Sequence, residues 1–370
     1  MAKGVYIGVG GTARKVKKMY VGVSGVARKI KKAYIGVGGV ARCFFCTELA
    51  YYGTATALSV ARGELAATTV GNYALFAGGV GSSLSSAVDA YNTSLVKSTH
   101  TSLSQARFNL GATTVGNYAL FGGGGASPYE SSTVDAYNTS LTRSTQTSLS
   151  ETRYALAATT IGNYALFGGG YSFTYRVSRV VDAYSSSLVR STPTALSVKR
   201  QALAATTVGS YALFGGGWDD NYDSSSVVDA YTASLTRSTP TALSVCHFQL
   251  MATTVGNYAL FGGGVEGNCT NIVDAYNTSL TRITPTALSV ARKYGAATTV
   301  GDYALFGGGY AGTTDTYSVV DAYNTSLIRS IPTALSRVRR TLAATTVGNY
   351  ALFGGGSDGS YTNVVDVYTA

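Results

Sequence analysis

A long internal repeat constrains this chain more than any other feature of its sequence. Each copy reads approximately L-S-x-x-R-x-x-L-A-A-T-T-V-G-N-Y-A-L-F-G-G-G, then a variable stretch, then V-V-D-A-Y-N-T-S-L-T-R-S-T-P-T-A. Its anchor tyrosine recurs every 45 to 47 residues, as Tyr91, Tyr137, Tyr184, Tyr231, Tyr276, Tyr323 and Tyr368. A unit of this length cannot bury its apolar face alone, so consecutive copies must pack on one another.

Each copy contains four short runs rich in Val, Tyr, Thr and Ala, which favour strands over helices. In the fourth copy these runs are residues 204–208, 211–215, 227–231 and 235–239. Seven four-stranded sheets of this kind close into a ring. We therefore predict an all-β fold, a seven-bladed β-propeller over residues 47–370, with almost no helix.

The two ends of the repeat array predict how the ring closes. The last copy stops after its third strand, at Tyr368-Thr369-Ala370. Residues 48–54 precede the first copy and align with the fourth strand of the others, so we expect them to complete the last blade. Closure of this kind removes the free strand edges of the ring. The first strand of each copy should lie nearest the axis, where the small Ala and Thr side chains fit.

Residues 1–46 form a separate, strongly basic part with a shorter repeat. Tyr6, Tyr20 and Tyr34 are 14 residues apart, and the segment holds ten of the 28 basic residues and no acidic one. The remaining chain is electrically balanced, so the net charge of +10 belongs to this segment. Two-residue turns are expected between strands of about ten to twelve residues. The basic residues expected to anchor the protein to a partner are Arg14, Lys15, Lys17, Lys18, Arg28, Lys29, Lys31 and Lys32.

One face of the predicted ring varies between copies. Antiparallel strands alternate in direction, so the loop after the second strand shares a face with the loop that enters the next blade. The opposite loops read V-G-N-Y and Y-N-T-S in nearly every copy. Aromatic and polar residues of the variable loops suit either a sugar or a protein partner; alternatively, the loops are merely solvated. The candidate ligand-binding residues are Trp218, Tyr222, Asp219, Asp220, Tyr171, Tyr175, Tyr310 and Tyr129.

A second candidate site follows from a basic residue placed four positions after each A-L-S leucine. These residues are Arg62, Arg107, Arg153, Arg200, His247, Arg292 and Arg339. A ring of them at the channel mouth would suit an anionic ligand such as teichoic acid or an acidic glycan, because arginine pairs with carboxylate and phosphate groups. Each copy also carries one aspartate in V-D-A-Y, and we prefer the alternative that each Arg and Asp form a structural ion pair.

The sequence argues against an enzyme and against a metal or organic cofactor. The two histidines, His100 and His247, occupy unrelated positions, and no nucleophile motif such as G-x-S-x-G is present. Cys43 and Cys46 form a single C-x-x-C without a second ligand pair, which we interpret as two small residues near the domain junction. No apolar run is long enough to cross a bilayer. The N-terminus lacks the apolar core of a secretion signal, so we expect synthesis in a cytoplasm without export by that route.

The glycine pair after a strand, the V-D-A-Y sequence and the following arginine resemble the kelch repeat over residues 47–370. Kelch blades usually carry a tryptophan shortly after the tyrosine, whereas this chain has leucine there, for example Leu95 and Leu235. The resemblance implies a propeller, and the departure separates the chain from the eukaryotic kelch adaptors.

The basic 14-residue repeats resemble the N-terminal repeats of tail and fibre proteins of bacteriophages that infect Gram-positive bacteria. This resemblance implies a virion structural protein that assembles in the bacterial cytoplasm and contacts other virion proteins through residues 1–46. The variable loops of the ring are then expected to bind a host-surface glycan. A protein dock is preferred to nucleic acid, no membrane insertion is expected, and a homotrimer is expected by analogy with fibres. The alternative is a non-adhesive cement protein or a kelch-type interaction scaffold.

Overall fold

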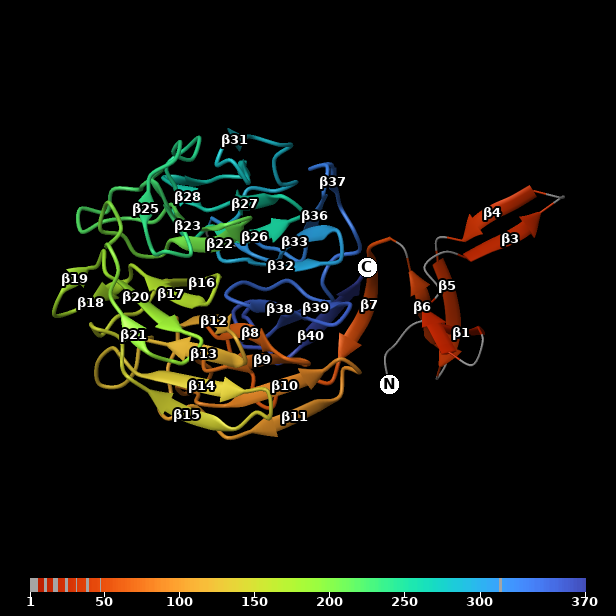
Figure 1. The fold of residues 1–370 in the computed structure, drawn as a ribbon, viewed down its shortest axis with the longest axis horizontal. Coiled ribbons are helices and arrows are strands. Elements are labelled where there is room, and N and C mark those ends of the chain that lie inside the picture. The colour runs from red at the N-terminus through yellow and green to blue at the C-terminus, as the bar shows by residue number, and fades with distance from the viewer. Residues whose placement is uncertain are drawn as a thin grey trace.

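Seven four-stranded antiparallel sheets surround a common centre in the computed structural model of this protein (Figure 1). This arrangement confirms the predicted all-β, seven-bladed β-propeller. Residues 48–312 and 315–370 are described in full; before them, the backbone of residues 6–9, 12–15, 19–23, 26–30, 32–37 and 40–46 is described. Within these described residues there is no helix that would be long and apolar enough to cross a membrane.

Each blade has four strand positions, counted outward from the axis. The innermost strands are β8 (Ala66–Val70), β12 (Gly111–Val115), β16 (Ala157–Ile161), β22 (Ala204–Val208), β26 (Met251–Val255), β32 (Ala296–Val300) and β38 (Ala343–Val347). The second strands are β9 (Tyr73–Ala77), β13 (Tyr118–Gly122), β17 (Tyr164–Gly168), β23 (Tyr211–Gly215), β27 (Tyr258–Gly262), β33 (Tyr303–Gly307) and β39 (Tyr350–Gly354). The third strands are β10 (Val88–Asn92), β14 (Val134–Asn138), β20 (Val181–Ser185), β24 (Val228–Tyr231), β30 (Val273–Asn277), β36 (Val320–Asn324) and β40 (Val365–Thr369). The outermost strands are β11 (Lys97–His100), β15 (Arg143–Gln146), β21 (Arg190–Ser191), β25 (Arg237–Ser238), β31 (Arg282–Ile283), β37 (Arg329–Ser330) and β7 (Ala50–Ala55).

The seventh blade is assembled from both ends of the ring sequence. Strand β7 pairs antiparallel with β40, with Thr54 opposite Asp366 and Ala50 opposite Thr369. The Tyr51 hydroxyl also donates a hydrogen bond to the Asp366 carboxylate at 2.6 Å. These contacts join the first and last strands of the ring, so no blade edge is left open between them.

The outermost strands are shorter than predicted in the blades where a proline follows. Strands β21, β25, β31 and β37 have two residues each, and Pro193, Pro240, Pro285 and Pro332 follow them within two positions. Blades one and two carry His100 and Gln146 at the proline position, and their outer strands β11 and β15 extend to four residues. Proline lacks the N–H that would continue the ladder, so the pairing ends before it.

The basic N-terminal segment forms three hairpins outside the ring (Figure 1). Their strands are β1 (Tyr6–Val9), β2 (Thr12–Lys15), β3 (Met19–Val23), β4 (Val26–Ile30), β5 (Lys32–Val37) and β6 (Val40–Cys46). The strands have four to seven residues, so the expected length of ten to twelve is wrong. The anchoring side chains of Arg14, Lys15, Lys17, Lys18, Arg28, Lys29, Lys31 and Lys32, and those of Cys43 and Cys46, lie outside the described residues.

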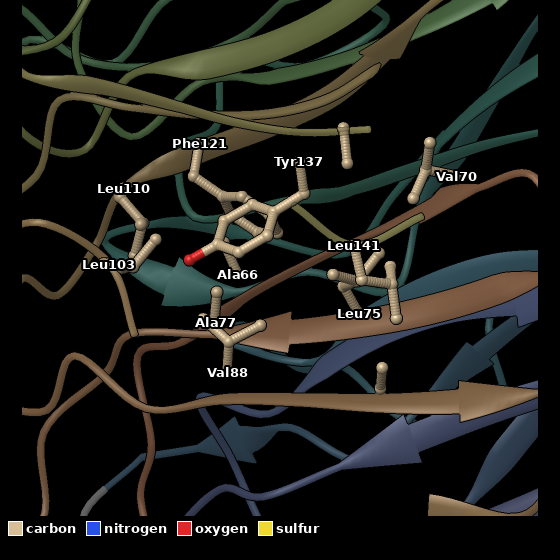
Figure 2. Packing of buried hydrophobic residues seen from close by; sticks show 12 residues of the cluster. Ala66, Val70, Leu75, Ala77, Val88, Leu103, Leu110, Phe121, Tyr137 and Leu141 are labelled. Atoms are coloured by element: carbon tan, nitrogen blue, oxygen red, sulfur yellow. The ribbon is translucent and has the colours of Figure 1, made fainter. Parts of the chain in front are cut away.

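Apolar side chains fill the space between neighbouring blades. Figure 2 shows one such cluster, in which Leu75 and Val88 of the first blade lie close to Phe121 and Tyr137 of the second. The Phe121 and Tyr137 rings meet edge to face at 5.9 Å, and the Tyr137 hydroxyl donates to the Thr101 carbonyl at 2.8 Å. Burial raises the pKa of the Tyr137 hydroxyl, which keeps this donor protonated. The repeated tyrosine is therefore both a core residue and a brace for the segment that enters its blade.

Close packing of blades explains the glycine at the end of the second strand. A Cβ atom on Gly168 would lie 2.7 Å from Cε1 of Phe214 in the next blade. Such a contact is far shorter than carbon atoms tolerate. The small residue thus makes room for the neighbouring phenyl ring.

In six of the seven blades a buried ion pair connects the entering segment to its blade, as blade two illustrates. The Arg107 guanidinium contacts the Asp135 carboxylate at 2.6 Å and donates to the carbonyls of Gly123 at 2.9 Å and Thr133 at 2.5 Å. Asp135 also receives Arg143 at 3.0 Å. Burial lowers the pKa of the Arg107 guanidinium and the Asp135 charge opposes that effect; arginine remains protonated at neutral pH.

The structure corrects the hypothesis of a basic ring that binds anions at the channel mouth. The side chains concerned are completely buried, and the arginines face aspartate partners and backbone carbonyls of their own blades. An external anion has no access to side chains buried in this way. The residues are Arg62, Arg107, Arg153, Arg200, His247, Arg292 and Arg339.

Blade five departs from this pattern because His247 replaces the arginine. Its Nδ1 atom donates to the Gly263 carbonyl at 2.6 Å, which leaves Nε2 unprotonated, and Nε2 has no hydrogen-bond partner among the described residues. Asp274 retains the contacts with Ser244 and Thr284 that Ser104 and Thr145 make with Asp135 in blade two, and Arg282 lies 3.8 Å away. Burial lowers the pKa of His247. The blade thus keeps its aspartate without the buried guanidinium.

We predict that Arg107→Met destabilises the protein strongly, because it leaves a buried carboxylate short of its main partner. The expected loss is about 3–5 kcal/mol in the free energy of unfolding, measured by urea denaturation. Arg143→Met is the matched control: it removes the half-exposed partner of the same Asp135, so about 1 kcal/mol or less is expected. Equal losses in the two variants would contradict a dominant role for the buried pair.

We further predict that His247 makes the ring sensitive to acid. Its pKa in the folded state lies below the value of about 6.5 in the unfolded chain, so the unfolded state takes up more protons as the pH falls below that value. Stability that is fully present above about pH 6.5 is then lost at up to about 1.4 kcal/mol per pH unit. Urea denaturation between pH 7.5 and 5 should give a shallower acid slope for His247→Gln than for the unaltered protein. His100→Gln, in the half-exposed outer strand β11, should keep the original slope; the reverse pattern would show that His247 is not responsible.

Candidate binding face

A closed ring of backbone hydrogen bonds organises the variable face. In each blade, the residue two positions after the buried Arg or His donates its N–H to the carbonyl of the equivalent residue in the preceding blade, at 2.8 to 3.3 Å. All seven residues have φ between 48° and 57°. They are Glu64, Asn109, Ala155, Ala202, Gln249, Tyr294 and Thr341. We call them the inner ring. The backbone makes the contacts, so the side chains are free to differ.

A second ring of variable residues surrounds the inner ring. The residue directly after each buried Arg or His forms a β-bridge with the first residue of the loop after the second strand of the same blade. The bridged pairs are Gly63–Val80, Phe108–Gly125, Tyr154–Tyr171, Gln201–Trp218, Phe248–Val265, Lys293–Tyr310 and Arg340–Ser357. Each blade thus has three variable positions on a regular backbone: the inner-ring residue and the two residues of the bridged pair.

Two aromatic clusters occupy this face. The Tyr171 cluster contains Phe108, Tyr154, Tyr171 and Phe173, whose successive rings lie 5.6 to 6.3 Å apart. In the Trp218 cluster, Trp218 stacks on Phe248 at 5.2 Å with an interplanar angle of 21°, and Tyr222 lies 4.8 Å from Trp218. The exposed fractions are 67% for Phe173 and 75% for Tyr222, so both clusters present large aromatic surfaces to solvent.

A third cluster combines aromatic rings with positive charge. The Tyr310 cluster contains Lys293, Tyr294, Tyr310 and Arg340. The guanidinium of Arg340 lies 4.3 Å from the centre of the Tyr310 ring, and the Lys293 ammonium lies 5.5 Å from the Tyr294 ring and 6.0 Å from the Tyr310 ring. These are cation–π contacts, which hold the charges above the rings.

A cavity of about 430 Å³ opens between the loops of blades three and four. Its walls are Arg179, Ser197, Val198, Lys199, Asp219, Asp220 and Asn221. Apart from Val198, all of these side chains are polar, and donors and acceptors are mixed. The cavity therefore suits a hydroxylated ligand of modest size.

Carboxylates hold the loops of neighbouring blades together. Asp220 of blade four accepts a hydrogen bond from the Val177 amide of blade three at 2.9 Å. Glu130 of blade two accepts one from the Phe173 amide, also of blade three. The blade-three loop is a short hairpin, β18 (Tyr171–Ser172) with β19 (Arg176–Val177), held from both sides. Similar hairpins are β28 (Val265–Glu266) with β29 (Asn268–Cys269) and β34 (Tyr310–Ala311) with β35 (Asp315–Thr316). Loops fixed in advance lose less entropy on binding.

The central channel differs in character from the variable face. It encloses about 570 Å³ and is lined by two threonines from each innermost strand, together with Gly71. Threonine hydroxyls of adjacent blades bond to one another at six of the seven junctions, for example Thr68 with Thr114 at 2.9 Å. The channel hydroxyls therefore link blades. Within the described part of the chain, no cluster of His, Cys, Asp or Glu is suited to hold a metal.

The predicted ligand-binding residues do not form one site. Trp218 and Tyr222 belong to the Trp218 cluster, Asp219 and Asp220 line the cavity, and Tyr171 and Tyr310 belong to the clusters named after them. Tyr129 and Tyr175 point into solvent, 70% and 54% exposed.

The sequence did not lead us to predict five residues of the variable face. Phe108, Tyr154, Phe248, Lys293 and Arg340 all directly follow the buried Arg or His. The repeat does indicate these residues: the two positions after the buried Arg or His vary between copies, although the residues around them repeat.

Comparisons with known proteins identify the architecture and nothing finer. No protein-family model matches the chain, and no curated protein is similar to it in sequence. Among solved structures, 612 chains match; one described as the structure of YjhT aligns with a TM-score of 0.61 and 11% identity over 75% of this chain and 99% of that one. At this identity the likeness shows the propeller fold alone. A fold this widely shared serves many functions, so function must be argued from the variable face.

We predict that Asp220 controls the rigidity of the blade-three loop. Asp220→Ala removes the acceptor of the Val177 amide, so hydrogen exchange in residues 172–178 should accelerate about tenfold or more. Asp219→Ala is the matched control, because Asp219 accepts from Asn221 and Asp223 within its own loop. Exchange mass spectrometry checks both variants, and unchanged exchange in Asp220→Ala would rule out this tether.

Proposed function

We propose that this protein is a non-enzymatic binding protein whose variable face recognises a glycan on a bacterial surface. The observation that carries the proposal is the tethered, aromatic-rich loop surface beside a polar cavity. Aromatic rings offer flat apolar faces, and sugar rings present apolar faces of similar size together with hydroxyl groups. Trp218 and Tyr222 supply such faces, and the neighbouring Asp219, Asp220 and Asn221 supply hydrogen-bond partners.

Binding accounts for this face better than catalysis. Catalysis needs groups with matched acidity that converge on one reacting atom. The buried arginines are committed to aspartates and carbonyls, and His247 is buried between blades. Of the four charged side chains that line the cavity, Lys199 and Asp220 are separated by 4.0 Å, Asp220 also tethers a backbone amide, and Asp219 accepts hydrogen bonds from amides of its own loop.

We also propose that residues 1–46 attach the ring to other virion proteins of a bacteriophage. Support comes from the resemblance of the basic 14-residue repeats to those of phage tail and fibre proteins, and from the concentration of ten basic residues in this segment. On this proposal the ring displays its variable face to the host, and three chains assemble around the hairpins.

A scaffold without sugar recognition is the second candidate. Exposed aromatic residues such as Tyr129, Phe173 and Tyr222 also anchor protein interfaces. A cement protein of this kind would stabilise a particle through residues 1–46 and would bind neither glycans nor cells.

The two candidates are distinguished by binding of the full-length protein to glycan arrays and whole bacteria. We expect saturable binding that Trp218→Ala and Tyr222→Ala each weaken about tenfold or more, because each removes a stacking surface. Ile328→Ala is the control, since this exposed residue lies in a turn on the opposite face. Glycans recovered unchanged after long incubation would agree with a non-enzymatic role. No binding to any glycan or cell, together with loss of particle stability on removal of residues 1–46, would support the scaffold.

A further inference from the structure

At the position directly after the buried Arg or His, positive charge occurs in two adjacent blades. In five blades the position after the buried Arg or His is uncharged, as Gly63, Phe108, Tyr154, Gln201 and Phe248. The adjacent blades six and seven instead carry Lys293 and Arg340 there. The bridge of Lys293 with Tyr310 is closed by two backbone hydrogen bonds of 2.9 Å, so this register is fixed.

Both cations lie against the same tyrosine ring. Arg340 is 4.3 Å and Lys293 is 6.0 Å from the centre of the Tyr310 ring. Among the described residues, neither cation has a carboxylate within ion-pairing distance, whereas Arg337 nearby is paired with Asp358. A single anionic group placed beside Tyr310 can therefore be reached by both side chains.

Acidic groups around this cluster make contacts of their own, and Glu64 also interacts electrostatically with Arg340, whose charge lowers the pKa of the Glu64 carboxyl group against the larger rise from burial. Glu64 of the inner ring accepts a hydrogen bond from the Asn109 amide at 2.9 Å. Asp358 receives the Arg337 guanidinium, and Asp315 lies in the hairpin strand β35, where it makes another polar interaction. Half-buried cations that lack a carboxylate within ion-pairing distance gain from a ligand that supplies one, and arginine can bind such a group through two parallel hydrogen bonds.

The cationic cluster is connected to the Trp218 cluster. The Gln249 side-chain amide donates to the Tyr294 hydroxyl, and these inner-ring residues are adjacent in sequence to Phe248 and Lys293 respectively. Oε1 of Gln249 has no partner among the described residues, although it is buried. A chain-like ligand that stacks on Trp218 therefore meets the two cations as it crosses to blades six and seven.

We propose that Lys293 and Arg340 form a subsite for a carboxylate or phosphate group of the bound glycan. This inference rests on the proposed glycan-binding function and narrows its ligand to an acidic polymer. The aromatic rings of Tyr310 and Tyr294 hold the cations and offer surfaces to the sugar that carries the acid. On this proposal, two residues of the variable face bind the anion, and the buried arginines do not.

The test uses the full-length protein and three oligomers of matched length: a galacturonate oligomer, a glycerol phosphate oligomer and an uncharged galactose oligomer. Calorimetry should show that at least one charged oligomer binds more tightly than the uncharged one. Arg340→Gln and Lys293→Gln should each lower the affinity for that oligomer about tenfold or more and leave the uncharged oligomer unaffected. The preferred charged oligomer identifies carboxylate or phosphate as the recognised group.

Arg337→Gln is the matched control, because it removes the same charge from the same blade but from a residue already paired with Asp358. It should retain the preference for the charged oligomer, and thermal unfolding checks that all variants are folded. Equal affinity of the unaltered protein for charged and uncharged oligomers, or an equal loss in Arg337→Gln, would overturn the subsite while leaving the glycan-binding proposal intact. If no oligomer binds and glycan arrays are also negative, both proposals fail.

Discussion

The buried pair between the entering segment and the third strand is the interaction on which this structure depends. In blade two, Arg107 reaches Asp135 and the carbonyls that end the second strand and precede the third. It therefore fixes the chain directly before the inner ring, where Asn109 bonds to Glu64 of the preceding blade. Charges buried this deeply are costly unless each is paired with an opposite charge, and the same Arg–Asp pair recurs in six of the seven blades.

The buried arginine contributes to stability, whereas the two residues that follow it are available for recognition. The arginine points into the blade, and the two residues that follow it emerge on the variable face with their backbone already bonded. Side chains as different as Glu64, Ala155 and Tyr294 occupy equivalent inner-ring positions. A surface built in this way changes its chemistry from blade to blade without a change of fold.

Blade five shows how far the pattern tolerates change. His247 forms no ion pair with Asp274, and the carboxylate keeps the serine and threonine contacts that are also present in blade two. A related exchange occurs where blade five meets blade six. In blade six, Gly295 takes the place of the leucine found in the other copies, and a Cβ atom on Gly295 would lie 2.5 Å from the Met251 sulfur. The larger Met251 of one blade thus fills the space that the other leaves. The Gly295–Met251 exchange thus preserves the packed volume between the blades, whereas the histidine leaves its buried Nε2 atom without a hydrogen-bond partner among the described residues.

The number of blades, the four strand positions in each blade and the face on which the loops vary could all be predicted from the repeat. A repeat of this length can bury its apolar side chains in few ways. The sequence by itself also indicated Trp218 and Tyr222 as surface residues and suggested an Arg–Asp pair. Only the tertiary structure decided that the arginines are buried, that proline shortens the outer strands, and that Lys293 and Arg340 meet at Tyr310. The physical reason is that repeat periodicity encodes local pairing, whereas burial and contacts between loops depend on how adjacent blades pack against each other.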